Sequence, residues 1–555
     1  MVRVPFQLCR TSGGRPVLKV PRFVPTRGSR CLKLDVRTAV NVVGATVAIA
    51  VLAGCASRAP SPALLAEVGK ADALLHEGCF ECLQDALAIY ERVAAAPYAP
   101  PDARRAAFDA AVLLTVRARE LGLPDRAWLQ RATALSVDLV ASPGAIDPRS
   151  VLEALPLISG EASGFPPDER ERRGRQRRAL FGPHGQMPAV RDALSSAVAS
   201  DVATQYVALA IDCEDAQRRK ALDFSALRAV HSSPLLQFRI ALCAGATDAL
   251  IALRASDSRW SDTLFFEGRR EMTRYPVPDV GKGAELYAQA HTVFPESTAI
   301  TLALGHGRNA LSEYEAALSL FDSVLATSPR HHDAVLGRLL SLSYLSRHND
   351  AIRTASALLD LGIFHQGDAY YWRAWNRYRV HLLPAAWDDV TAALTLMVNT
   401  SVHTLAGFIA YAQQRLDTAI DHLGRAYRLD QTNCEAVWTE GLVHVDKQDW
   451  TPAAARFEAA VKCFGEAAEQ ARRDIATAEG APWADAVKAR RIAAARKRID
   501  TSEHRRAQAA YNAAGSHARL GNKPEALAFL EIAATHPLLN EKATALRATV
   551  EKRQD

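Results

Sequence analysis

The sequence predicts an all-α protein, a solenoid of stacked helical hairpins with a capping helix at its C-terminal end. Three observations support this fold class: alanines recur every 34 residues, further columns repeat at the same spacing, and no strand-rich segment interrupts the pattern. The chain has 555 residues, of which 49% are hydrophobic and 23% charged, an ordinary globular composition. Such a length exceeds a single core and is compatible with an extended array.

The repeat is defined by five alanines, Ala317, Ala351, Ala385, Ala419 and Ala453. Three more columns keep the spacing: Gly305, Leu339, Arg373, Gly407 and Gly441; Phe321, Ala355, Asp389, Leu423 and Phe457; Val324, Leu358, Ala392, Ala426 and Ala460. Small residues let the two helices of a unit approach closely, and bulkier ones contact the next unit. The unit around Ala385 fits these columns least well.

This pattern resembles the tetratricopeptide repeat, a 34-residue helix-turn-helix. One unit cannot bury its apolar face alone, so several must stack. Extending the spacing backwards reaches Gly283 and Ala249. We therefore expect an array of seven units over residues 232–465.

Segments outside the array also have helical patterns. Pro and Gly are dense in residues 143–188, which indicates a linker or insertion, and its run 168–178 is rich in arginine. Basic residues recur through 466–510, most simply on a solvated helix face, with docking to anionic lipid or an acidic partner as the alternative. The expected division outside the array is a leader at 1–54, a tether at 55–63, helical hairpins at 64–142, the linker or insertion at 143–188, a helical connector at 189–231, a long charged helical segment at 466–510, and a C-terminal repeat with its cap at 511–555.

The first 54 residues have the features of an export signal. A stretch rich in arginine precedes a short apolar run, residues 39–54. The run ends in Leu52-Ala53-Gly54-Cys55, which resembles the lipobox of bacterial lipoproteins. The resemblance implies lipidation of Cys55 and, since the next residue is Ala56, an outer-membrane protein facing the periplasm. The alternative is a single membrane-spanning anchor.

Charge outside the leader is nearly balanced. Residues 1–54 contain nine of the 67 Lys and Arg residues and one of the 61 acidic residues, which leaves 58 basic and 60 acidic side chains. Global charge therefore gives no reason to expect nucleic acid as a partner.

Six cysteines remain beyond Cys9, Cys31 and Cys55, and an even number in an exported chain permits disulfides. Cys434 and Cys463 are expected at one end of a helical hairpin and form the best pair; Cys213 and Cys243 form a looser one. Cys79 and Cys82 make a CxxC that is compatible with a local bridge, a redox pair or two buried thiols. Ligand spacing for a metal is absent from the sequence.

In the tetratricopeptide family the first helix of each unit lines the concave groove. The resemblance assigns these groove positions to His306, Asn309, Tyr344, Tyr370, Arg377, Tyr378, Phe408, Tyr411 and Trp438. Such a groove suits an extended peptide or the apolar face of a helix, since aromatic rings give contact area and Arg377 can grip a carboxylate. The alternative is that these residues only pack between helices.

Catalytic motifs are missing: the sequence has no HExxH, GxSxG or GxxxxGK[ST], and we expect neither an enzyme nor a cofactor. The expected function is a non-enzymatic, membrane-anchored scaffold that binds a peptide or helix of another protein, in envelope assembly or secretion. Two alternatives remain, a lipoprotein that binds glycans or small molecules for uptake, and a thiol redox lipoprotein that uses Cys79 and Cys82.

Overall fold

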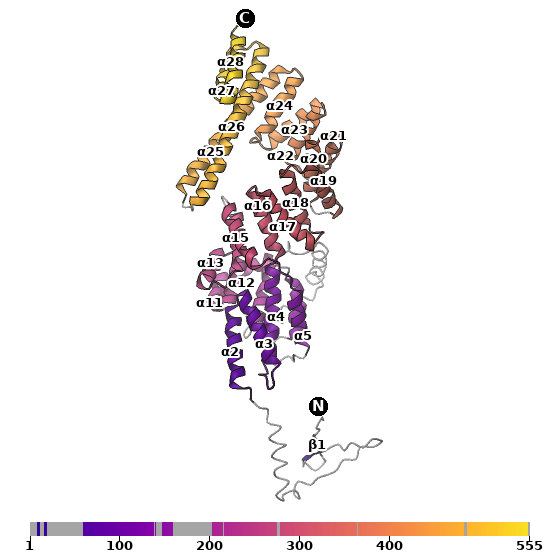
Figure 1. The fold of residues 1–555 in the computed structure, drawn as a ribbon, viewed down its shortest axis with the longest axis vertical. Coiled ribbons are helices and arrows are strands. Elements are labelled where there is room, and N and C mark those ends of the chain that lie inside the picture. Colours follow the sequence, from indigo (N-terminus) through magenta and orange to yellow (C-terminus); the bar gives the residue numbers. More distant parts are fainter. Residues whose placement is uncertain are drawn as a thin grey trace.

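The protein was examined as a computed structural model, which describes residues 8–10, 16–18, 59–137, 139, 147–158, 202–214, 216–274, 278–362, 365–481 and 485–552. Within this part, β1 (Leu8–Arg10) and β2 (Pro16–Leu18) pair antiparallel, and all other regular structure is helical. The all-α prediction is therefore confirmed for the array and the helices around it (Figure 1). Cys55, the apolar run 39–54, the tether up to residue 58 and the arginine-rich run 168–178 lie outside the described residues.

The N-terminal helices form a bundle around α4. This helix is buried along nearly its whole length because α3, α5 and α9 all pack against it. Ser61 begins the bundle, since its hydroxyl accepts a hydrogen bond from the Leu64 amide and caps α2. The helices are α2 (Pro62–Glu77), α3 (Phe80–Ala94), α4 (Ala103–Glu120), α5 (Arg126–Ser136), α6 (Pro148–Ala154), the 3₁₀ turn η1 (Leu155–Leu157), α9 (Val202–Glu214), α10 (Ala216–Ala221) and α11 (Phe224–Val230).

Seven helical hairpins follow in the described part of the chain. Their helices are α12 (Pro234–Ala244), α13 (Thr247–Ser256), α14 (Thr263–Thr273), α15 (Val280–Val293), α16 (Thr298–Ala310), α17 (Tyr314–Thr327), α18 (His332–Tyr344), α19 (His348–Asp360), α20 (Gln366–Arg379), α21 (Leu383–Leu396), α22 (Thr400–Ala412), α23 (Leu416–Leu429), α24 (Cys434–Asp446) and α25 (Trp450–Gly480). From α16 on, the first helices begin at 34-residue intervals. The repeat spacing is therefore also the spacing of the hairpins.

The turns inside these hairpins repeat as well. In the five hairpins from α16 to α25, each turn contains one non-glycine residue in the left-handed backbone region, which lets the second helix fold back on the first. These residues are Ser312, Ser346, His381, Gln414 and Gln448. Their φ angles, and that of His365, the N-cap of α20, lie between 56° and 63°. Four of them keep the 34-residue spacing, and His381 lies one residue late.

The late turn corrects our alignment of the unit α20–α21. Helix α20 has 14 residues, whereas α18 and α22 have 13. Its partner helix is consequently displaced by one residue, so that Ala386 and Ala393 are fully buried in place of Ala385 and Ala392. The next unit returns to the spacing at Thr400. This unit therefore differs from the others by a one-residue displacement, and its packing remains that of a helical hairpin.

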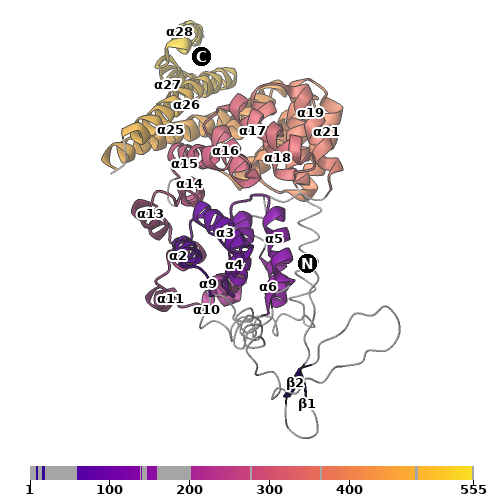
Figure 2. The same ribbon diagram turned by 60° about the horizontal axis from the view of Figure 1, so that its bottom comes forward.

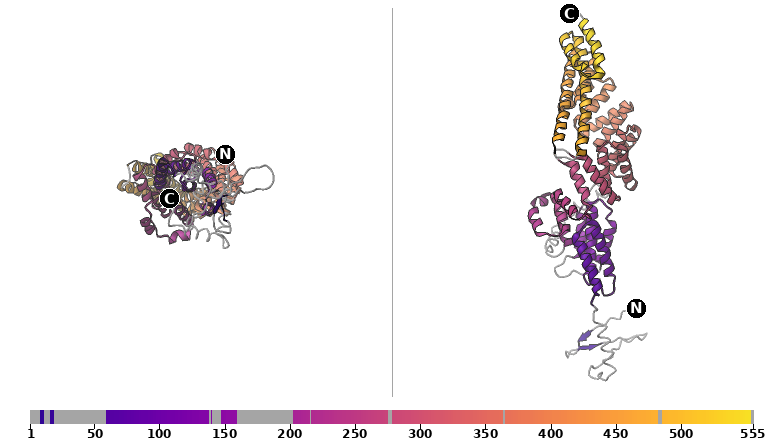
Figure 3. Two further views of the ribbon diagram at one scale, coloured as in Figure 1. Left: turned by 90° about the horizontal axis from the view of Figure 1, so that it is seen from below. Right: turned by 60° about the vertical axis from the view of Figure 1, so that its left-hand side comes forward.

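Beyond the array, two long helices form a hairpin. Helix α25 continues past the length of an ordinary repeat helix to Gly480, and α26 (Asp485–Leu520) returns along it. Helix α27 (Lys523–Ala534) packs on α26, and α28 (Pro537–Lys552) covers the end of the stack. The views in Figures 1, 2 and 3 show an elongated molecule with α2 to α5 toward one end and α28 at the other. No helix in the described residues is both long and apolar enough to span a membrane.

Candidate partner-binding face

The first helices of the repeat units line one side of the array. Helix α16 contacts α18, α18 contacts α20, α20 contacts α22, and α22 contacts α24, whereas contacts of this extent do not join successive second helices in the described residues. Helices that approach each other more closely lie on the inner side of a curved stack. The first helices therefore form the inner face, as the resemblance implies for a binding groove.

Glycines fix how the first helices α22 and α24 lie against their partner helices. A Cβ atom at Gly441 would lie 2.7 Å from the ring of Phe457, and one at Gly407 would lie 2.5 Å from Cγ of Leu423. Both distances are too short for a real contact, so the glycine column is required for this helix pairing. The opposite side of each first helix faces the inner side of the curved stack.

Tyr344, at the end of α18, is the most exposed aromatic residue of the expected groove set. Its ring stacks on Tyr314, with centroids 4.8 Å apart, and meets the edge of Trp372 at 5.5 Å. Even so, 54% of its surface remains exposed. Burial raises the pKa of its hydroxyl above the ordinary value, which keeps the group protonated and able to donate a hydrogen bond.

Further aromatic residues continue from α20 to α22. The rings of Tyr378 and Phe408 stack with centroids 6.5 Å apart, and Trp375 lies 6.3 Å from Tyr378. Tyr370 lies under the guanidinium of Arg373, 5.5 Å from its ring centroid. These side chains are half-buried, and the contact between Tyr378 and Phe408 joins consecutive units. We define the aromatic face as Tyr314, Tyr344, Trp372, Tyr378 and Phe408.

Arg377 is engaged within the chain. Its Nη1 donates to Oδ2 of Asp389 at 2.7 Å and to the carbonyl of Ala385 at 3.2 Å. Arg373 donates to both oxygens of the same carboxylate, whose side chain is only 3% exposed. The structure therefore gives the carboxylate partner of Arg377 as Asp389, and the aromatic face has no free cation from this position.

His306 and Asn309 lie on α16 and contact neighbouring helices. Asn309 accepts a hydrogen bond from the Ser341 hydroxyl at 2.9 Å and donates to the carbonyl of Gly337 at 3.4 Å, which ties α16 to α18. The ring of His306 meets the edge of Phe321 at 5.1 Å. Asn309 thus has a packing role, the alternative that the sequence left open, whereas His306 remains exposed beside its contact with Phe321.

Tyr411 and Trp438 also have partners inside the chain. The Tyr411 hydroxyl donates to Asp446 at 2.7 Å, and burial together with this hydrogen bond raises the pKa of Tyr411 to about 12. Arg505 of α26 lies 5.0 Å from the ring centroid of Trp438 and pairs with Glu435 at 3.2 Å. The groove set therefore divides into aromatic residues on α18 to α22, of which Tyr344 is exposed and the others are half-buried, and residues that join helices.

All three candidate cysteine pairs are joined in the structure. Cys434, at the start of α24, is bonded to Cys463 of α25 across one end of the hairpin, with Cα atoms 5.5 Å apart. Cys213 of α9 is bonded to Cys243 of α12, with a Cα separation of 5.6 Å. These bonds link helices that already pack together.

The CxxC bond is buried at the start of α3. Cys79 caps this helix, since its sulfur accepts a hydrogen bond from the Cys82 amide at 3.1 Å, and it is bonded to Cys82. The two residues are 0% and 1% exposed. A redox partner must reach one sulfur for thiol exchange, and this burial opposes such access. The bridge therefore has the geometry of a local structural bond.

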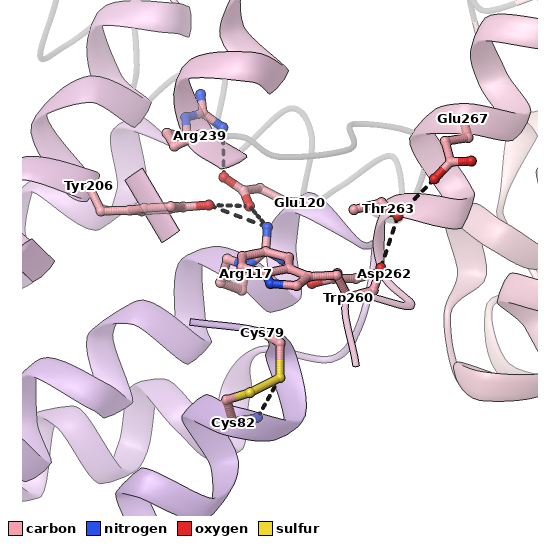
Figure 4. Close-up of polar contacts among 10 residues, drawn as sticks. All are labelled: Cys79, Cys82, Arg117, Glu120, Tyr206, Arg239, Trp260, Asp262, Thr263 and Glu267. Carbon is pink, nitrogen blue, oxygen red and sulfur yellow. Dashed lines mark hydrogen bonds and ion pairs between the residues drawn. A yellow bond between two sulfur atoms is a disulfide. The ribbon is translucent and has the colours of Figure 1, made fainter. Parts of the chain in front are cut away.

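A cluster of buried charges next to this bridge was not found by the sequence analysis (Figure 4). Arg117 donates to Glu120 at 2.8 Å and also contacts Asp262. Glu120 in turn accepts from the Tyr206 hydroxyl at 2.7 Å and from Arg239 at 2.6 Å. The cluster joins α4, α9, α12 and the start of α14, helices that are far apart in the sequence.

Electrostatics explain why this cluster is tolerated. Its two guanidinium groups face two carboxylates, so the buried charges balance. Burial alone would lower the pKa of Arg117, but Tyr206, Asp262 and Glu120 raise it above the ordinary value. Arg117 is therefore a cation fully enclosed by protein. Each charge of the cluster lies beside an opposite charge, and we assign the cluster to the stability of the N-terminal bundle.

Comparisons with known proteins give fold-level likenesses only. No family model matches the sequence, and no curated protein matches it. Among solved structures, YrrB, described as a TPR protein with an unusual peptide-binding site, is 18% identical, covers 32% of this chain and 93% of its own, and has a TM-score of 0.28.

Two other structures cover more of the chain. A tetratricopeptide repeat protein from Parabacteroides merdae is 13% identical over 53% of this chain and 99% of its own, with a TM-score of 0.34. A chain in the crystal structure of the APC/C hetero-tetramer Cut9-Hcn1 is 13% identical over 85% of this chain and 87% of its own, with a TM-score of 0.33. The tetratricopeptide-type architecture of the present chain rests on its own hairpins, whose first helices recur every 34 residues.

Proposed function

We propose that this protein is a non-enzymatic scaffold that holds a peptide or helix of another protein on the aromatic face, while a lipid at Cys55 tethers it to the cell envelope. The observation that carries the proposal is the exposure of Tyr344 among aromatic rings that come from four consecutive units. Tyrosine and tryptophan supply large contact areas at low cost in side-chain entropy, which favours protein recognition.

The chemistry of the face favours a partner recognised by apolar and hydrogen-bonding contacts. Arg373 and Arg377 share the carboxylate of Asp389, so both guanidinium groups are engaged within the chain, and the Tyr344 hydroxyl remains protonated at neutral pH. A partner therefore meets ring surfaces and hydroxyl donors, next to two guanidinium groups that share one carboxylate. An extended segment or an amphipathic helix offers the complementary apolar side chains.

The membrane tether rests on the sequence Leu52-Ala53-Gly54-Cys55. A chain anchored by several acyl groups is held stably at the membrane, and tethering raises its local concentration near envelope partners. A Cys55→Ser variant tests this proposal by detergent phase partition. The wild-type protein is expected in the detergent phase. The variant is expected to remain unprocessed and to carry no acyl groups. If the N-terminal peptides of the two proteins differ in mass only by the substitution, lipidation is contradicted.

Partner binding is tested by placing a photo-crosslinking amino acid at Tyr344 in living cells. We expect one defined protein adduct, which disappears when Tyr378→Ala is added. The matched control is the same crosslinker at Leu429, which is 53% exposed at the end of the second helix α23. Identical adducts from both positions would contradict the proposed face. Sugar binding to the purified protein that is lost in Tyr344→Ala, without a protein adduct, would instead favour the glycan-binding alternative.

A further inference from the structure

The α25–α26 hairpin reaches back to the beginning of the array. We define the arm as residues 466–481 and 485–505, the described part of this hairpin that extends beyond ordinary repeat helices. At its tip, Arg490 pairs with Glu285 of α15 at 3.3 Å, and Arg491 donates a hydrogen bond to the carbonyl of Pro278. These contacts join positions 205 and 213 residues apart in sequence.

Gly281 of α15 makes room for the tip. A Cβ atom at this position would overlap the guanidinium group of Arg490, so the absence of a side chain lets Arg490 lie against the helix. Arg490 therefore lies in close contact with α15 at this position.

The other end of the arm is fixed to the array. Arg505 lies over Trp438 and pairs with Glu435 of α24, and beyond it Ala509, Ala510 and Ala513 are fully buried. The arm is held together by ion pairs between its own helices, Arg498 with Asp474 at 2.6 Å and Arg472 with Glu503. Figures 1 and 3 show it on the opposite side of the array from α19 and α21, the side of the first helices.

The two ends of the arm differ in strength. The base is attached by buried apolar contacts, whereas at the tip the side chains of Arg490 and Glu285 are 43% and 65% exposed. Exposed ion pairs contribute little stability and are weakened by salt. A hairpin with a firm base and a weak tip can release its tip without loss of the fold.

We propose that the arm is a strap that closes the inner side of the array and releases α15 to admit the partner of the aromatic face. The closed state is the one in the structure, with Arg490 and Arg491 on α15. This inference rests on the proposed function for the identity of the occupant, but strap opening itself needs no partner. The partner is then enclosed between the arm and the first helices, which suits a chain segment better than a whole domain.

Amide hydrogen exchange of the whole purified protein in detergent, followed by mass spectrometry, tests the strap. In Glu285→Arg we expect exchange in residues 278–285 and 485–491 to become about two- to fivefold faster, the range for loss of an exposed ion pair. Addition of 0.5 M NaCl to the wild-type protein is expected to act in the same direction. Circular dichroism checks that the helical content of the variant is unchanged.

The charge-swapped double variant Glu285→Arg/Arg490→Glu is expected to restore slow exchange at both segments, because the ion pair re-forms with reversed signs. The matched control is Glu296→Arg, an exposed glutamate near the start of α16, which should leave both segments unchanged. The proposal is overturned if Glu285→Arg and high salt leave exchange at both segments as it is in the wild-type protein at low salt. Since no partner is added, this result is independent of the crosslinking test of the proposed function.

Discussion

The guanidinium carbon of Arg117 lies over the ring of Phe238, 3.7 Å from its centroid, and both side chains are fully buried. A cation on an aromatic face is attracted by the negative charge of the ring, and the attraction is stronger without water. The contact adds to the ion pairs of Arg117 with Glu120 and Asp262. The N-terminal bundle thus contains a polar centre that depends on one residue.

Arg117→Met is expected to destabilise the protein by about 3–5 kcal/mol, because it leaves Asp262 and Glu120 with too little positive charge in a buried site. Urea unfolding monitored by circular dichroism measures the loss. The control is Arg92→Met, which removes an exposed ion pair with Glu67 and should cost less than about 1 kcal/mol. Equal effects of the two substitutions would contradict the role of the buried cluster.

Two glycine-to-alanine substitutions should have opposite signs. Gly441→Ala places a Cβ 2.7 Å from the ring of Phe457 and should destabilise by about 1–3 kcal/mol. At Gly515, inside α26, no atom lies within 4 Å of the added Cβ, so Gly515→Ala should stabilise by about 0.5–1 kcal/mol. Thermal unfolding of both variants measures these effects. A stabilising Gly441→Ala would show that the helices can separate at this point.

Removal of the bond between Cys434 and Cys463 should lower stability by about 3–4 kcal/mol, since the bond closes a loop of about 30 residues in the unfolded chain. The measurement is urea unfolding of the double Cys434→Ser/Cys463→Ser variant. Peptide mapping without reductant should find this pair, together with Cys213 and Cys243, in linked peptides. Free thiols at these positions would contradict the bonded structure.

His365 makes stability depend on pH above neutrality. Hydrogen bonds to Asp333 at 2.9 Å and to Asp368 raise the pKa of His365 to about 9. A raised folded-state pKa favours the charged imidazole, so its contribution is complete below about pH 6.5, the unfolded value, and is lost as pH rises through about 9. We expect unfolding free energy to fall between pH 6.5 and 9, and less steeply in His365→Gln. Parallel pH curves would exclude this linkage.

Tyr344→Ala and Arg377→Ala should separate binding from stability. Tyr344 is half exposed, so its removal should weaken partner binding by about tenfold or more while the unfolding free energy changes little. Arg377→Ala deprives the buried Asp389 of one of its two cations and should mainly destabilise the fold. Partner titration and urea unfolding of each variant measure both quantities. A destabilised Tyr344→Ala would assign Tyr344 to packing.

The helical architecture could be predicted because one packing rule recurs along the chain. Each small residue at a glycine column, such as Gly407 or Gly441, meets a bulky residue sixteen positions later, so the pattern is visible without coordinates. The displacement at Ala386 could not be predicted, since one extra residue in α20 is compensated before α22 begins. Only the burial of Ala386 and Ala393 reveals it.

The candidate site could be predicted less well for a different reason. The resemblance identifies positions on the first helices, but it does not identify which of these side chains find partners in the same chain. Arg377 and Asn309 were expected to face a partner and instead bond to Asp389 and Ser341. The Arg117 cluster has no sequence signal, because Tyr206 and its other members come from unrelated segments.

The extra residue of α20 also limits how this array can be rebuilt. Suppose that an idealised 34-residue module with a 13-residue first helix replaced the unit between α19 and α22, and that its second helix kept the present sequence positions. The buried face of that second helix would then be rotated by about 100° unless its side chains were reassigned. The lengthened helix and the shortened connection before Thr400 compensate each other and form one inherited unit. An engineer who grafts modules into this array must therefore transfer residues 366–399 as a single block.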